Sequence, residues 1–194
     1  MRGLLRDCNQ GKEIRLCDEA LESAGNIVAL LELIYFAKPP SLNGSSKPFR
    51  IQEFLSLIRL LRKYECDLAL NCIRQNTKIL SYQSQSSSFG TFVIAAEFED
   101  VDTCAQVIVA KGGHSWRAIP QESIGYELDA AVGDCPVFDL TGISYAYFEL
   151  LPLRYAHALL RANRITVAEK QQKSKWKLVS AEFKRLMTQQ PGEH

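Results

Sequence analysis

The stretch of chain from Phe49 to Gln75 places the strongest constraint on how this protein can fold. Apolar residues recur there every three or four positions, which is the spacing of one face of an α-helix. The first such set is Phe54, Leu57, Ile58 and Leu61. A second set follows Tyr64 and consists of Leu68, Ala69, Cys72 and Ile73. The stretch therefore predicts a helical hairpin whose apolar faces are buried against other helices.

A helical pattern also precedes the hairpin. Ser23 is a suitable N-cap for a helix over residues 24–36, which Pro39 and Pro40 end. We expect its buried stripe to consist of Ile27, Leu30, Leu31 and Ile34. The only strand that the pattern indicates near this end is a short one at Ile14–Leu16.

Further helices are predicted after the hairpin. Asp100 is the expected N-cap of one of them. The predicted ranges are 89–97, 101–111, 140–151, 153–163 and 165–189, with a short helix at 126–132. Residues 81–88 (SYQSQSSS) read as a polar linker. The predicted fold class is mainly α, with at most one or two short strands.

The composition is typical of a soluble globular protein, with 46% hydrophobic and 23% charged residues. The longest apolar run, Ile27–Ala37, is interrupted by Glu32 and is too short to cross a bilayer. No apolar signal-peptide core follows Met1. We therefore expect a cytoplasmic or nuclear location, where the six cysteines would be free thiols.

The sequence contains no pattern that indicates catalysis or metal binding. There is no Cys-x-x-Cys pair, and the three histidines lie far apart in the chain. No Gly-x-Ser-x-Gly motif is present. The acidic residues between Glu97 and Asp102 are best explained by the start of a helix. We predict no catalytic residue, no cofactor and no structural metal, and hence a protein that is not an enzyme.

Positive charge is concentrated near the C-terminus. The segment from Arg161 to Met187 has eight Lys and Arg but two Glu, although the net charge of the chain is only +1. The candidate basic patch is Lys170, Lys173, Lys175, Lys177, Lys184 and Arg185. A basic amphipathic helix of this kind can bind nucleic acid, an anionic membrane or a partner groove. Alternatively, its apolar residues Trp176 and Phe183 pack on the body of the protein and its lysines are solvated.

Four segments together resemble a known family. They are LELIYFAKPP, EFLSLIRLLRKYECD, FVIAAEFEDVDTCAQVIVAKG and FDLTGISYAYFELLPLR, in that order along the chain. In their order and in features such as Tyr35 before Pro39-Pro40 and Lys63-Tyr64 before Asp67, they resemble the BTB/POZ-domain proteins of fungi, particularly mushroom-type fungi. The resemblance spans about residues 12–160.

The resemblance implies a partial domain, because most of the N-terminal strands and helices of a BTB/POZ domain are missing. Either the gene product is shortened or the start of the gene is misplaced. The implied organisation is a partial BTB/POZ-like domain at 1–80, the linker, a helical extension at 89–164 and the basic helix and tail at 165–194. Homodimerisation is doubtful, because in the family it depends largely on the missing part.

The resemblance also implies a non-catalytic protein–protein interaction module. Its expected partners are proteins such as transcription regulators or cullin-type ubiquitin ligases, for which family members act as adaptors. Phe36, Phe49 and the loop between them form the candidate contact surface, since loops on a rigid scaffold often carry binding and aromatic residues contribute strongly to interfaces. The structural alternative is that these two aromatic residues fix the loop ends to the core.

Overall fold

The computed structural model describes residues 18, 21–40, 51–83, 88–115, 135–143, 145–164 and 172–189, with only the backbone described for 172–174. The helices in order are α2 (Ala24–Phe36), α3 (Ile51–Lys63), α4 (Asp67–Tyr82), α5 (Ser88–Glu97), α6 (Val101–Lys111), the 3₁₀ helix η5 (Leu140–Gly142), α7 (Tyr145–Phe148), α8 (Leu153–Ala162) and α9 (Gln172–Thr188). The described residues contain no strand, only an isolated antiparallel bridge between Ser115 and Pro136. The prediction of a mainly α fold is confirmed. None of the helices described is long and apolar enough to cross a membrane.

Two helix starts are set by the side chains that the sequence indicated. The Ser23 hydroxyl accepts a hydrogen bond from the backbone N–H of Asn26 at 3.3 Å. The Asp100 carboxylate accepts one from the N–H of Thr103 at 3.0 Å. Each cap satisfies an N–H group that has no partner within the helix. The predicted bounds 24–36 and 101–111 are therefore confirmed.

The structure corrects several other bounds. Helix α4 continues through Tyr82 and α5 begins at Ser88, so residues 81, 82 and 88 of the predicted linker are helical. The helix predicted over 140–151 is instead two short elements, η5 and α7. The reason lies at Asp139, whose carboxylate accepts hydrogen bonds from the backbone N–H and hydroxyl of Thr141 and holds a tight turn. The expected strand at 14–16 and helix at 126–132 lie outside the described residues.

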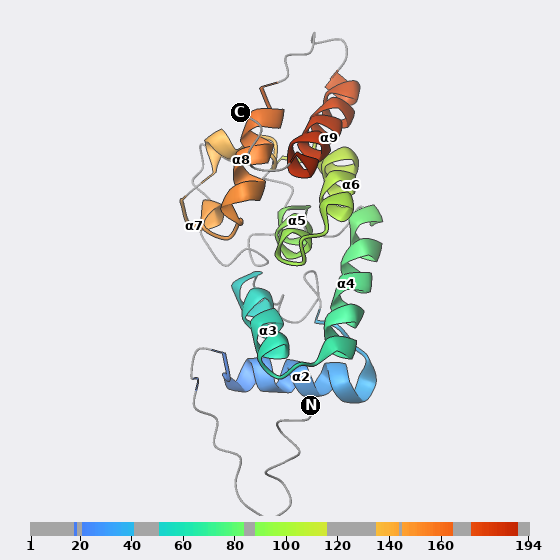
Figure 1. The fold of residues 1–194 in the computed structure, drawn as a ribbon, viewed down its shortest axis with the longest axis vertical. Helices are drawn as coiled ribbons and strands as arrows, with labels where there is room; N and C mark the ends of the chain where they lie inside the picture. The colour runs from blue at the N-terminus through green and yellow to red at the C-terminus, as the bar shows by residue number, and fades with distance from the viewer. Residues whose placement is uncertain are drawn as a thin grey trace, which may run out of the picture.

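The helices pack around two hydrophobic clusters. Helix α2 lies across one end of the molecule, and α8 and α9 lie towards the other (Figure 1). One cluster joins α2, α3 and the first half of α4, and the other joins α5 to α9. The division is not clean, because Ile51 and Leu55 of α3 belong to the second cluster while Ile94 and Phe98 belong to the first. Helices α3 and α5 therefore connect the two halves.

The apolar face of α9 is part of the core. Val179 and Phe183 are fully buried, and α9 packs on α6 and α8. The indole of Trp176 lies so close to Gly112 that a Cβ at this position would overlap the ring. The φ angle of Gly112 is an ordinary −60°, so close packing, not backbone freedom, requires glycine there.

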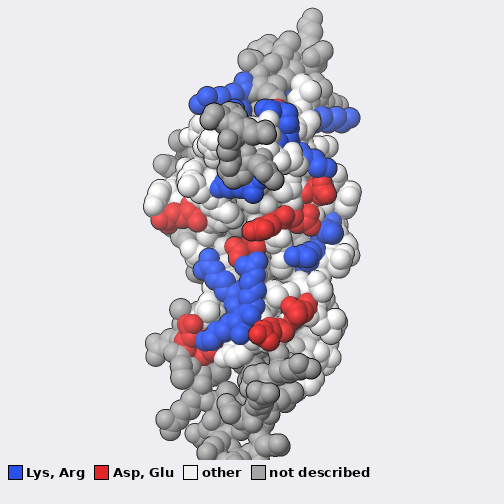
Figure 2. Space-filling model, viewed as in Figure 1, with Lys and Arg blue, Asp and Glu red and all other residues white. Residues whose placement is uncertain are grey.

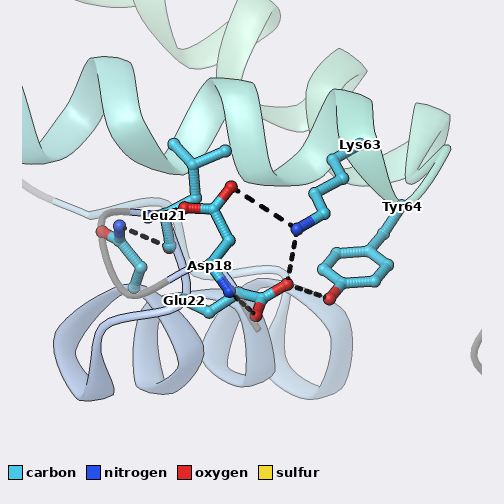
Figure 3. A network of polar contacts seen from close by, with 6 residues as sticks. Asp18, Leu21, Glu22, Lys63 and Tyr64 are labelled. Atoms are coloured by element: carbon cyan, nitrogen blue, oxygen red, sulfur yellow. Dashed lines mark hydrogen bonds and ion pairs between the residues drawn. The ribbon is translucent and has the colours of Figure 1, made fainter. Parts of the chain in front are cut away.

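A polar network fastens the segment before α2 to the end of α3 (Figure 3). The Glu22 carboxylate accepts hydrogen bonds from Lys63 Nζ at 2.8 Å, from the Tyr64 hydroxyl and from the backbone N–H of Asp18 at 2.9 Å. These donors favour the charged carboxylate and lower the pKa of Glu22 to about 2. The network fixes α2 across the end of α3.

Candidate functional site: an apolar groove between α2 and α4

Helix α2 is apolar on two opposite faces. Its sequence, AGNIVALLELIYF, contains one charged residue, so there is no polar face to orient it. The residues buried against α3 and α4 are Asn26, Ala29, Leu30 and Leu33. The predicted buried stripe is therefore wrong in part: Leu30 is buried, Ile27 and Ile34 are half-buried, and Leu31 is 45% exposed.

The outer face of α2 carries large apolar side chains in solvent. Val28, Leu31 and Tyr35 follow one another at spacings of three and four residues on the side away from the core. Their exposed fractions are 55%, 45% and 75%. A helix that is apolar all round is normally buried on all sides. We call Val28, Leu31 and Tyr35 the outer face of α2.

A groove of about 610 Å³ opens beside the C-terminal end of α2. Helix α2 contributes one wall, and the turn between α3 and α4 with the first half of α4 contributes the other. The lining residues are Leu33, Ile34, Ala37, Glu65, Cys66, Asp67, Leu68, Ala69, Asn71, Cys72 and Gln75. The volume falls within the usual range of ligand and side-chain pockets, about 300–1,000 Å³. We call this feature the α2–α4 groove.

Leu68, at the start of α4, is exposed although the sequence predicted that it would be buried. The sequence placed it on the inner face of the second helix of the hairpin, but 86% of its surface is exposed. Ala69 and Ile73 occupy the buried positions instead. Leu68 therefore adds an exposed apolar side chain to the lining of the α2–α4 groove.

The groove also contains two unusual backbone conformations. Ala37 and Glu65 are both in the left-handed region, with φ of 48° and 51°. Each follows the C-terminus of a helix, a position that glycine normally occupies. A side chain in this conformation costs about 1–2 kcal/mol. Strained residues of this kind are concentrated at functional sites.

Phe36, the one predicted contact residue that the structure describes, is not among the residues that line the α2–α4 groove. Phe36 is the last residue of α2 and is 76% exposed, so it does not fix the loop end to the core. Phe49 lies outside the described residues. The groove residues were missed, because a groove arises from the approach of two helices. The sequence feature that could have indicated an exposed apolar surface was the lack of a polar face in residues 24–36.

The basic patch on α9 is partly neutralised. Lys184 pairs with Asp102 at 2.5 Å and Arg185 with Glu182 at 2.6 Å. Lys175 lies 5.2 Å from the centre of the Trp176 ring, and Lys177 is exposed. Lys170 and the side chain of Lys173 lie outside the described residues. Basic and acidic side chains also lie beside each other across the middle of the molecule (Figure 2).

One buried cluster contains residue types that are used in catalysis. Ser88 Oγ lies 3.1 Å from His114 Nδ1, and the ammonium of Lys111 donates to the carbonyl of Leu80 at 3.0 Å. Burial lowers the pKa of Lys111 to about 8. Ser88 and Lys111 are each only 1% exposed, which keeps them out of reach of a substrate in solution. The cluster connects the ends of α4, α5 and α6.

Comparisons with known proteins do not identify a relative. No family model, curated protein or solved structure matches the chain. Within the described residues, no group of three His, Cys, Asp or Glu side chains is arranged to hold a metal ion. Among the described residues, the α2–α4 groove and the outer face of α2 are the candidate functional surfaces.

Proposed function

We propose that this protein is a non-catalytic protein–protein interaction module of BTB/POZ-like type that binds its partner through the outer face of α2 and the α2–α4 groove. The observation that carries the proposal is the two-sided apolar character of α2. One face already fills the core, while Val28, Leu31 and Tyr35 remain in solvent. Tyrosine is enriched at the centres of interfaces, and exposed apolar patches mark interaction sites.

Helix α9 is a weaker candidate for the main binding element. Its apolar face is used inside the protein, and two of its described cations have carboxylate partners. Only the outer surface of α9 remains for nucleic acid or anionic lipid. An interaction there would weaken steeply as salt rises, whereas an apolar interface would respond little.

Partner capture with the immobilised full chain tests the proposal. The variant Leu31→Ser/Tyr35→Ser removes two exposed side chains of the outer face, and Leu178→Ser, an exposed leucine on α9, is its control. We expect the proteins retained by the natural chain, quantified by mass spectrometry, to be lost from the α2 variant and kept by the control. Retention of the same proteins by the α2 variant would contradict the proposal. Loss through Lys177→Glu, with strong salt dependence, would favour nucleic-acid or membrane binding instead.

A further inference from the structure

The charge at the mouth of the α2–α4 groove points to the chemistry of its occupant. Glu65 and Asp67 line the groove and are exposed. Within the part of the chain that the structure describes, neither carboxylate is paired with a cation. By contrast, Glu22, Glu97, Asp100, Asp102 and Glu182 each have a Lys or Arg partner. Glu32, Glu99, Asp139 and Glu149 likewise have no Lys or Arg partner within the described residues, so Glu65 and Asp67 are distinguished by lining the groove together.

Glu65 lies in the turn between α3 and α4. The dipole at the C-terminus of α3 disfavours a carboxylate there, while the dipole at the N-terminus of α4 favours one. Its backbone is left-handed, although Cys66 N–H to Leu61 C=O and Glu65 N–H to Arg62 C=O complete a turn in which glycine would be preferred. Glu99 has the same conformation between α5 and α6. Glu65 differs from Glu99 in lining the groove, together with Asp67 in the first turn of α4.

We infer that the α2–α4 groove binds an amphipathic helical segment of a partner protein, with apolar side chains in the groove and Lys or Arg side chains against Glu65 and Asp67. The apolar wall formed by Leu33, Ala37 and Ala69 accepts the apolar face of such a segment. The acidic mouth attracts cations and repels an acidic segment. This inference rests on the proposed function and adds the chemistry of the partner.

Two labelled peptides test the inference on the full chain. One is a fluorescein-labelled amphipathic peptide of leucine and lysine at helical spacing, and the other is identical except that every lysine is glutamate. Fluorescence anisotropy should show binding of the lysine peptide and not of the glutamate peptide. The variant Glu65→Asn/Asp67→Asn should weaken binding of the lysine peptide about tenfold, the combined effect of two exposed ion pairs of ordinary strength.

Glu99→Asn provides a matched control. Glu99 is the other left-handed glutamate, with φ of 55°, and it ends α5 through hydrogen bonds equivalent to those of Glu65. Asparagine tolerates this backbone, so both Glu65→Asn and Glu99→Asn should leave the urea midpoint unchanged or raised. Only the groove variant should lose peptide affinity. If Glu65 and Asp67 had only a structural role, peptide affinity would fall only together with the urea midpoint.

Cys72 reports whether the peptide occupies the groove. Its half-buried thiol lines the wall, while the half-buried Cys135 lies elsewhere in the second hydrophobic cluster. Bound lysine peptide should slow alkylation of Cys72 by N-ethylmaleimide and leave Cys135 unchanged. Absence of binding, equal affinity in the Glu65→Asn/Asp67→Asn variant, or an unprotected Cys72 would each overturn the inference. If partner capture still depends on Leu31 and Tyr35, the interaction module stands with a partner of different chemistry.

Discussion

At the scale of single residues, Glu22 makes the stability of the protein depend on acid pH. Its pKa is lowered to about 2 in the folded protein, while an unfolded chain has the ordinary value near 4.5. The folded state therefore binds fewer protons between these values, and the stabilisation present at neutral pH is lost as pH falls from about 4.5 towards 2. We expect Glu22→Gln to lower the urea midpoint at pH 7 and to make little difference near pH 2.

Glu32→Gln is the control for this measurement. Glu32 lies on α2, and its carboxylate has no hydrogen-bond or ion-pair partner within the described residues. Its substitution changes the charge by the same amount without removing a contact. A loss of stability in Glu22→Gln that is equal at pH 7 and pH 2 would show that the carboxylate is not held in its charged form.

Lys111 makes stability depend on pH in the same direction, but in an alkaline window and through a buried cation. Its folded-state pKa of about 8 lies below the ordinary value of 10.5, because the ammonium is buried. The unfolded chain binds more protons between pH 8 and 10.5, so this residue makes stability rise with pH across that window. We expect urea denaturation of Lys111→Met to show a smaller rise than the natural chain. An identical rise of stability with pH in both proteins would show that a group other than Lys111 causes it.

Gly112 shows how closely α6 and α9 approach. Since a Cβ would overlap the Trp176 ring, Gly112→Ala should destabilise the fold by about 1–3 kcal/mol, as overpacking does. The neighbouring Gly113 has only a 3.9 Å contact to the indole, so Gly113→Ala is the control. Trp176→Leu makes room for the methyl group, and its combination with Gly112→Ala should cost less than the two separate losses together. Additive losses in denaturant titrations would contradict the close approach.

At the scale of elements, the two faces of α2 can be distinguished with adjacent leucines. Leu30 is buried against the core, whereas Leu31 belongs to the exposed outer face. Leu30→Ala should lower the free energy of unfolding by about 2–5 kcal/mol, the usual range for a core leucine. Leu31→Ala should change it by less than about 0.5 kcal/mol. Equal losses, measured by urea denaturation, would show that the outer face is covered within the isolated chain.

The same helix shows what the sequence could and could not predict. Local chemistry set its ends, since Ser23 caps the start and Pro39-Pro40 follow the end. Its rotation about its axis could not be predicted, because that requires a contrast between polar and apolar faces. Helix α3 has that contrast, and its predicted inner face, Phe54, Leu57, Ile58 and Leu61, is buried. The α2–α4 groove depends on the angle between two helices, which no local pattern specifies.

At the scale of the whole molecule, the two hydrophobic clusters should unfold together. Ile94 of α5 and Phe98, just after its end, reach into the cluster of α2–α4, and Ile51 and Leu55 of α3 reach into the other. Arg62 adds an ion pair to Glu97 and lies 5.9 Å from the centre of the Phe98 ring, and Arg74 lies 5.2 Å from the same ring. Separating the halves would expose apolar surface on both sides.

The natural chain should therefore unfold in one transition. Circular dichroism and the fluorescence of Trp176, measured in a Trp116→Phe background, are expected to give coincident urea curves, because helix content and the environment of α9 are lost in the same step. Ile94→Ala should shift both curves equally, although Ile94 packs in the cluster remote from Trp176. Phe36→Ser, which replaces an exposed residue, should shift neither. Two separate transitions, or a shift of one curve alone, would show that the halves are independent folding units.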